Sequence, residues 1–292
     1  MKQTVRTWLR ESEVDIFLAY RNLHGHMLPF AFSRNNLDDI EDMVASGPEY
    51  PLEKLALELI ADQPGIKVGI LGDEVTRRAI NVFSAWNQAS QESIRVLTRD
   101  HAPPEPAESP AGTPKVVGIR EDMDLESFEE MEPPQRFAGW MLEFQKCMKC
   151  YGCRNICPVC FCKECSLENQ ELIGTGTVLT EVPIFHLVRA VHMAGRCVDC
   201  GLCEAACPVG IPLRLLYRKV NAIVKGLFGY ETGSSPGSLR SAYWVRKSRW
   251  NLGPLCETGY LEGKRSECDG LSICAVGLFV LRDGLRGPLQ GH

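Results

Sequence analysis

The sequence predicts an α+β protein with more than one domain, in which a small α/β domain precedes an α-helical domain built around cysteine clusters. Three observations predict this arrangement. Strand-like and helix-like segments alternate through residues 1–100. Residues 101–115 hold five prolines, which resist regular structure and favour a semi-rigid spacer. Eleven of the fourteen cysteines then fall between Cys147 and Cys207, and none falls before Cys147.

The composition is that of an ordinary globular protein, with 45% hydrophobic and 24% charged residues. The formal net charge of −5 offers no basic surface to a polyanion, so we expect no nucleic-acid partner. The opening residues lack the apolar core of a signal peptide, and the longest nearly apolar run, 271–281, is too short to cross about 30 Å of hydrocarbon. We therefore expect a cytoplasmic protein without membrane insertion, in which bunched cysteines are metal ligands rather than disulfides.

Residues 1–100 are predicted to form the α/β domain. The segment KVGIL at 67–71 is typical of a buried strand, and the spacing of leucines in 52–61 is helical. Alternating strands and helices favour a mainly parallel sheet. His24 and His26, in NLHGHM, are interpreted as a turn. The expected helices are 4–10, 37–45, 52–61 and 74–86, and the expected strands are 14–20, 27–32, 67–71 and 94–98.

A proline-rich linker, 101–123, separates this domain from a predicted helical domain, 124–230. Pro134 suits the first turn of a helix. Two further helices are expected at 183–195 and 213–228, so each cysteine cluster is entered or left through a helix. The helix that begins near Pro134 is expected to present an apolar face made of Phe137, Trp140, Met141 and Phe144.

Two runs of four cysteines repeat the same spacing and the same trailing proline. The first is Cys147-x2-Cys150-x2-Cys153-x3-Cys157-Pro158, and the second is Cys197-x2-Cys200-x2-Cys203-x3-Cys207-Pro208. In such runs three thiolates two residues apart ligate one [4Fe–4S] cubane, and the fourth cysteine ligates the other cluster. The predicted ligands are Cys147, Cys150, Cys153 and Cys207 for the first cluster, and Cys197, Cys200, Cys203 and Cys157 for the second.

The alternative is a pair of closed zinc sites, but two runs with identical spacing favour paired cubanes. The 39 residues between Cys157 and Cys197 leave room for at least one helix. We therefore expect an all-helical dicluster domain rather than a compact ferredoxin of β type.

A third group, Cys160-x-Cys162-x2-Cys165, suggests a further iron–sulfur or zinc site that would need a fourth ligand. The alternative is that these cysteines only pack beside the cubanes. Residues 231–292 are rich in Gly, Ser and Arg, and no structure is predicted for this tail. Its three cysteines lack motif spacing and are interpreted as free thiols. The candidates for the fourth ligand are His186, His192, Cys256, Cys268 and Cys274.

His186, Arg189 and His192 share one face of the helix before the second motif. In the functional reading, these side chains donate hydrogen bonds to cluster sulfurs or face a partner. In the alternative reading, they form a solvated polar face. Donors near a cluster raise its reduction potential.

The run from Cys147 to Tyr230 resembles a family of iron–sulfur proteins related to the beta subunits of formate dehydrogenases and of deazaflavin-reducing hydrogenases. The resemblance is carried by CMKCYGCRNICPVCFCKEC, FHLVRAVHMAGRCVDCGLCEAACPVGIPLRLLYRKV and LFGYETG, and it continues more weakly through EVDIFLAYRN and IKVGILGDEVTRRAI. The cluster domain also resembles the helical ferredoxin domains of heterodisulfide reductase and succinate dehydrogenase iron–sulfur subunits. The resemblance implies an electron-transfer subunit partnered by a formate dehydrogenase, a hydrogenase or a heterodisulfide-reductase-like protein.

One departure from the family concerns the first domain. Relatives with a full first domain carry cysteines after the strand that matches 67–71, whereas this chain reads GDEVTRRA there. GILGDE suggests only weakly a phosphate-cradling turn, because the GxGxxG and Walker patterns are absent. A bound flavin is therefore doubtful.

No catalytic arrangement of side chains stands out, so we expect an electron relay between redox subunits. The alternative from the enzyme class is a flavin-binding oxidoreductase that acts on a deazaflavin or nicotinamide. A redox sensor or scaffold is a third reading, although both cysteine runs are complete, whereas sensors usually hold exposed or incomplete clusters.

Overall fold

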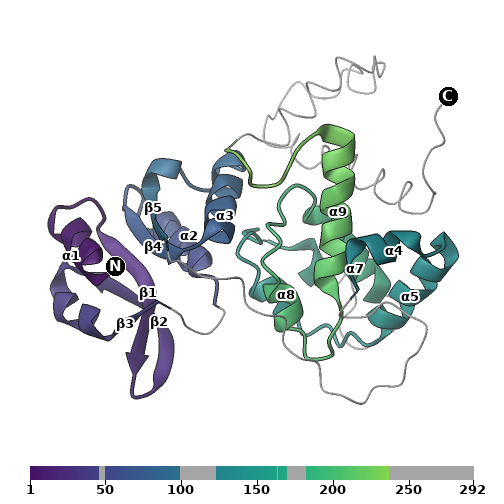
Figure 1. The fold of residues 1–292 in the computed structure, drawn as a ribbon, viewed down its shortest axis with the longest axis horizontal. Coiled ribbons are helices and arrows are strands. Elements are labelled where there is room, and N and C mark those ends of the chain that lie inside the picture. Colours follow the sequence, from purple (N-terminus) through teal and green to yellow (C-terminus); the bar gives the residue numbers. More distant parts are fainter. Residues whose placement is uncertain (46–49, 99–122, 163, 170–181, 237–292) are drawn as a thin grey trace. The chain divides into compact units, whose positions relative to one another are not determined.

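The computed structural model describes residues 1–45, 50–98, 123–162, 164–169 and 182–236. The chain divides into two units (Figure 1). The first consists of residues 1–115 together with 154–161 and 233–236, and the second consists of the remainder. The predicted linker, apart from its last residue, and nearly all of the predicted tail lie outside the described residues.

The first unit is built on a mixed five-stranded sheet. β1 (Ile16–Leu23) pairs antiparallel with β2 (His26–Ser33) along the whole of one edge. Its other edge pairs parallel with β4 (Val68–Gly72) and, further along, antiparallel with the short β3 (Met43–Val44). β4 in turn pairs parallel with β5 (Ile94–Thr98). The expected mainly parallel sheet is therefore wrong for β2 and β3.

A tight turn explains the antiparallel half of the sheet. His24 and Gly25, between β1 and β2, have φ of 52° and 87°, the left-handed values that a two-residue hairpin turn needs. Asn22 Oδ1 accepts a hydrogen bond from the Gly25 N–H at 2.9 Å. A two-residue connection can only reverse the chain, so β2 must run against β1. The predicted turn is confirmed at His24, whereas His26 already begins β2.

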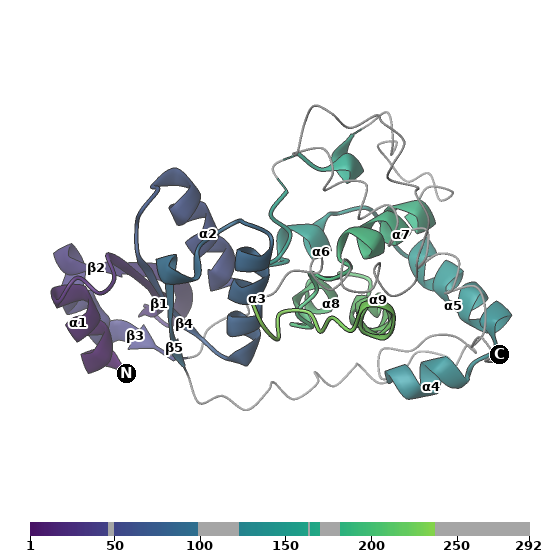
Figure 2. The ribbon, with the colours of Figure 1, turned by 90° about the horizontal axis from the view of Figure 1, so that it is seen from above.

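Helices cover both faces of this sheet (Figure 2). α1 (Lys2–Arg10) packs on Phe17 and Ala19 of β1, whose side chains point to one face. α2 (Leu52–Asp62) and α3 (Glu74–Ala85) contact β4 on the other face. A short 3-10 helix, η2 (Gln91–Ser93), leads into β5.

The helix expected at 37–45 is wrong. The chain instead forms a 3-10 helix, η1 (Arg34–Asp42), followed by β3. Ser33 caps η1 through the Asn35 N–H, and Asn36 departs from helical geometry with φ of −135°. Met43 then pairs with Arg21 in the sheet. Tertiary pairing with β1 therefore overrides the local helical pattern.

The second unit is helical. Its long helices are α5 (Pro133–Gln145), α7 (Val182–His192) and α9 (Leu213–Phe228), and α7 packs against both α5 and α9. The three helices predicted here are confirmed, although α7 ends earlier than expected. The shorter elements are α4 (Leu125–Glu130), α6 (Gly152–Asn155), whose last two residues belong to the first unit, η3 (Ser166–Glu168) and α8 (Leu202–Ala205). Within the described residues, no helix combines the length and apolar character of a membrane span.

A row of rings joins α5 to α7 and to the first cysteine motif. Phe144 stacks on His186 with ring centroids 4.6 Å apart, and Phe185 meets the edge of His186 at 5.1 Å. Phe185 also contacts Tyr151, beside Cys150, at 5.4 Å. The predicted apolar face of α5 is only partly buried, because Phe137 is 53% exposed. The buried rings therefore fix α7 beside the loop that carries the first cysteines.

Candidate iron–sulfur centres

The first cysteine motif follows α5 in a loop that twice enters the left-handed backbone region. Lys149 and Tyr151, on either side of Cys150, have φ of 52° and 59°. Such values cost a non-glycine residue about 1–3 kcal/mol and are retained where the site requires them. Alternating left-handed and ordinary residues turn successive N–H groups into one concavity, which is a known arrangement at iron–sulfur sites. The Lys149 N–H also donates to Cys147 Sγ at 3.3 Å.

The second motif repeats this backbone. Asp199 and Gly201, which flank Cys200, have φ of 60° and 81°. The short helix α8 then occupies the place that α6 has in the first motif. The Ile211 N–H donates to Cys207 Sγ at 3.4 Å. The two loops share a conformation although the flanking side chains differ, which indicates that the cysteine geometry sets the backbone.

Cys207, the last cysteine of the second motif, lies among the thiols of the first. Both Cys147 and Cys153 interact electrostatically with Cys150 and with Cys207. The loops are in close contact here, since a Cβ on Gly152 would lie 3.3 Å from the carbonyl oxygen of Ala206. These contacts place Cys207 near the first three cysteines, as the ligand set predicted for the first cluster requires. The set itself stays a prediction.

The electrostatics of these four thiols fit a bound iron–sulfur cluster. Burial, together with the smaller effect of the neighbouring thiols, raises the pKa of Cys153 to about 11. Burial likewise raises the pKa of Cys147. Four thiolates so close together repel one another, and a coordinated metal supplies the compensating positive charge.

Arg189 of α7 supports the first motif from behind. Its side chain is 2% exposed, and Nη2 donates to the Cys153 carbonyl oxygen at 2.8 Å. Its guanidinium carbon lies 5.7 Å from the ring centroid of Tyr217 on α9. The positive charge lowers the pKa of Cys153 against the effect of burial. This residue therefore links α7 and α9 to a predicted cluster ligand.

The solvated polar face expected for α7 is wrong for its two inner residues. His186 is 1% exposed, and burial, followed by the charge of Arg189, lowers its pKa to about 4. Neither ring nitrogen has a hydrogen-bond partner within the described part of the chain. His192 is half-buried, and burial also lowers its pKa. The structure gives His186 an aromatic rather than a cysteine environment.

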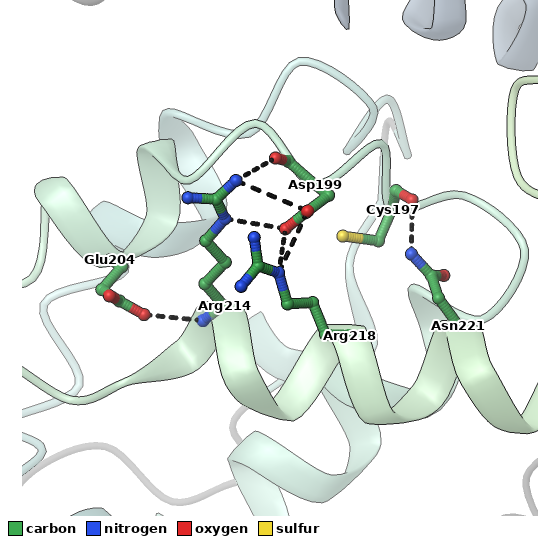
Figure 3. Close-up of polar contacts among 6 residues, drawn as sticks. All are labelled: Cys197, Asp199, Glu204, Arg214, Arg218 and Asn221. Atoms are coloured by element: carbon green, nitrogen blue, oxygen red, sulfur yellow. Dashed lines mark hydrogen bonds and ion pairs between the residues drawn. The ribbon is translucent and has the colours of Figure 1, made fainter. Parts of the chain in front are cut away.

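The second motif is anchored to α9 by ion pairs (Figure 3). Arg214 Nε donates to Asp199 Oδ1 at 2.8 Å, and its Nη2 donates to the Asp199 carbonyl oxygen at 3.2 Å. Arg218 Nε lies 3.0 Å from both carboxylate oxygens of Asp199. One carboxylate inside the cysteine motif thus holds two guanidinium groups from successive turns of one helix.

Two hydrogen bonds to backbone groups extend this anchor (Figure 3). Glu204 of α8 accepts from the Arg214 backbone N–H at 2.9 Å, which satisfies a donor in the first turn of α9. Asn221 Nδ2 donates to the Cys197 carbonyl oxygen at 2.9 Å. Sequence reasoning missed this polar stripe. Its signal was present, because residues 214, 218 and 221 recur at helical spacing.

Cys157 belongs to a segment held by the first unit. Lys54 of α2 donates to the Asn155 carbonyl oxygen at 2.7 Å, and the Phe83 and Phe161 ring centroids lie 6.2 Å apart. Cys157 itself is buried, and its N–H donates to the Arg154 carbonyl oxygen at 3.2 Å. Its assignment to the cluster of Cys197, Cys200 and Cys203 stays a prediction.

The third cysteine group also stays a prediction. Cys162 is exposed, and its Sγ accepts from Arg196 Nη1 at 3.5 Å, while Cys160 and Cys165 are half-buried. Among the described residues, no three Cys, His, Asp or Glu side chains converge as they would on one metal ion. A [4Fe–4S] cubane does not require three side chains to converge on one ion, because each of its four thiolate ligands binds a different iron atom. The tail cysteines lie outside the described residues.

Comparisons with known proteins address the chemistry of these motifs. Residues 190–212 match the 4Fe-4S binding domain family. One stretch of 94 residues is 39% identical to the F420-dependent formate dehydrogenase subunit beta of Methanocaldococcus jannaschii. The predicted resemblance is confirmed. A stretch of 118 residues is also 31% identical to the F420-dependent formate dehydrogenase 1 subunit beta of Methanococcus maripaludis.

The matches are partial on both sides. They cover 32% and 40% of this chain, and 25% and 30% of the two relatives. The chain therefore spans about a quarter to a third of the length of the curated relatives it matches. What is established is an iron–sulfur protein that resembles a formate dehydrogenase beta subunit in part.

Proposed function

We propose that this chain is an electron-transfer subunit that carries two [4Fe–4S] clusters and relays electrons between a catalytic oxidoreductase subunit and an acceptor. A catalytic subunit of formate dehydrogenase type is favoured, because the two similar proteins are named as beta subunits of that enzyme. The observation that carries the proposal is the position of Cys207 among the first three cysteines.

Exchange of the fourth ligand makes the two clusters neighbours. If Cys207 completes the first site and Cys157 completes the second, each motif contributes to both clusters. Two cubanes joined in this way are held close to each other by the chain itself. When bound, each cluster supplies one-electron chemistry at a potential that its surroundings adjust.

The protein's own residues then orient and shield the clusters. The left-handed residues at 149, 151 and 199 shape the two cysteine loops, and the Lys149 N–H donates to Cys147 Sγ. Arg189 fixes the Cys153 backbone, and Asn221 fixes that of Cys197. These contacts come from α7 and α9, so the packing of the second unit sets the geometry of the ligands.

The first motif provides the exposed edge. Met148 is 54% exposed and Cys150 is exposed, whereas the matching residues of the second motif are less so, with Val198 only 1% exposed. Ile184 on α7 is 54% exposed as well. We place the contact with a partner subunit at this edge, because electron transfer between proteins requires a short path from cluster to surface.

The finer expectations belong to the same proposal. A hydrogenase or a heterodisulfide-reductase-like protein is the alternative partner to a formate dehydrogenase, and we place the complex in the cytoplasm. We propose a third metal at Cys160, Cys162 and Cys165 only as an addition to the relay.

Reciprocal substitutions test the ligand exchange. In anaerobically purified full-length protein, Cys207→Ala should remove the cluster of the first motif, and Cys157→Ala should remove that of the second. Each variant is the control for the other, and iron and sulfide content with electron paramagnetic resonance would report which cluster remains. Loss of the same cluster in both variants, or zinc in place of iron, would overturn the proposal.

A second experiment tests the relay itself. The co-purified complex should reduce both clusters when formate is added, and the Cys207→Ala complex should lose electron delivery to the acceptor while the catalytic subunit still oxidises formate with an artificial dye. Undiminished delivery to the natural acceptor would show that electrons bypass this chain.

The alternative, a flavin-binding oxidoreductase subunit acting on a deazaflavin or nicotinamide, is less well supported by the first unit. Asp73 Oδ1 accepts from the N–H groups of Val75 and Thr76 at the start of α3, so its own carboxylate occupies donors that a phosphate would need. A Cβ on Gly72 would lie 2.4 Å from Thr76, which leaves no space at this turn. Stoichiometric flavin in the purified holoprotein would restore this alternative.

A further inference from the structure

The two cysteine motifs differ in charge at a position where their backbones are alike. Lys149 and Asp199 each precede the second cysteine of a motif, and both have left-handed φ. Lys149 is buried, whereas Asp199 is half-buried and carries two guanidinium groups. The surroundings of the second motif therefore contain two guanidinium groups and two carboxylates, those of Asp199 and Glu204.

Arg214 is the member of this group that reaches the cluster site. Its Nη1 would lie 3.7 Å from a Cβ built on Gly201, the residue after Cys200. It also interacts electrostatically with Cys200 itself. Burial tends to lower the pKa of Arg214, but the hydrogen bond and charge of Asp199 raise it above the ordinary value. The guanidinium is therefore charged at every working pH.

Asp199 keeps the Arg214 charge in one place. It accepts from Nε and Nη2 of Arg214, so the planar guanidinium group cannot rotate away from the motif. The Glu204 carboxylate holds the backbone N–H of the same residue. A long side chain that is otherwise free to extend into water is thus fixed against Asp199, the residue before Cys200 (Figure 3).

We propose that Arg214, oriented by Asp199, is a positioning residue that raises the reduction potential of the second-motif cluster. This inference rests on the proposed function and deepens it. One-electron reduction adds a negative charge to the thiolate-bound cluster, and a fixed positive charge nearby stabilises that reduced form. Asp199 has two opposing effects, because it holds Arg214 in place and its own charge partly offsets that of the guanidinium.

Redox titration of the full-length protein tests this inference. The variants are Arg214→Gln, Arg214→Lys and Asp199→Asn, with Arg218→Gln as the matched control that removes the same charge one turn further along α9. The signals of the two clusters are assigned beforehand in a Cys207→Ala background. The cluster of the first motif serves as an internal control in every sample.

Arg214→Gln should lower the ratio of reduced to oxidised second-motif cluster about tenfold at the wild-type midpoint, which corresponds to about 59 mV for a one-electron couple. Arg214→Lys should lower the midpoint by less, because lysine keeps the positive charge but cannot form the two-pronged guanidinium contact with Asp199. Asp199→Asn should shift the midpoint upward. Arg218→Gln should shift it less than Arg214→Gln.

Three results would overturn the inference. Unchanged midpoints in an Arg214→Gln protein of full iron content would show that Arg214 only anchors α9. Equal shifts of both clusters would show a general effect of net charge. If Arg214→Gln assembles no second cluster, an Arg214→Lys protein of full iron content with an unchanged midpoint decides against the inference. A wild-type protein without reducible clusters would instead refute the proposed function, and this inference with it.

Discussion

Replacement of His186 by phenylalanine should make the protein less sensitive to acid. The imidazole is buried between Phe144 and Phe185 and has a pKa of about 4, well below its ordinary value. An imidazole in the unfolded chain takes up a proton once the pH falls below about 6.5, whereas the folded protein resists protonation down to about pH 4. The unfolded state therefore binds more protons throughout this window.

The magnitude follows from the difference in proton binding. Stability should decrease by up to about 1.4 kcal/mol per pH unit within the window, and by about 3 kcal/mol across the whole of it. Above about pH 6.5 the imidazole is neutral in both states and its contribution is constant. At neutral pH the variant should differ from wild type by less than about 2 kcal/mol, because removal of unpartnered polar atoms and addition of ring volume oppose each other.

Urea unfolding of anaerobic protein, followed by circular dichroism, measures this difference. The gap between His186→Phe and wild type should change by about 2 kcal/mol in favour of the variant between about pH 7 and about pH 5. His24→Asn, in the exposed β1–β2 turn, is the control for the loss of one imidazole. Parallel pH profiles for His186→Phe and wild type would refute the buried, neutral state of His186.

Three further predictions concern both units. Gly72→Ala should destabilise the protein by about 1–3 kcal/mol, because the added Cβ would lie 2.4 Å from Thr76. Gly226→Ala, at a position with open space on α9, should stabilise it by about 0.4–1 kcal/mol. Urea unfolding midpoints in the opposite order would contradict this packing. Asp73→Ala should cost about 0.5–2 kcal/mol through loss of the α3 cap, and an unchanged unfolding curve would argue against that cap. Anaerobic removal of iron should lower the thermal midpoint, because the link between the two motifs is lost; a scan that matches the holoprotein would exclude a structural role for the metal.

Local pattern was sufficient for most helices of this chain. The helix at 213–228 and the strand at 94–98 were predicted to the residue. Periodic apolar side chains and proline at a helix start are local signals, and they operate wherever the segment can bury one face. The misplaced helix at 37–45 and the mainly parallel sheet failed for the same reason. β3 pairs with β1 across a long stretch of sequence, which no local pattern reveals. β2 pairs with β1 through a tight turn, and that turn, rather than the alternation of strands and helices, sets the antiparallel direction.

The site shows the same division between local and distant information. Cysteine spacing predicted the ligands, because cluster chemistry demands a fixed arrangement of thiolates along the chain. It could not indicate Arg189 or Asn221, whose roles depend on α7 and α9 lying against the motifs. It also left the environment of His186 open, since helical spacing tells which residues share a face but not what covers that face.

By itself, the sequence determined the cluster chemistry, the ligand spacing and the resemblance to formate dehydrogenase beta subunits. The tertiary structure alone decided that His186 and Arg189 are buried and that two arginines of α9 converge on Asp199. The physical reason is that cluster chemistry depends on the type and spacing of the ligands, which are properties of short stretches of sequence. Burial and charge environment arise from packing between segments that are far apart along the chain.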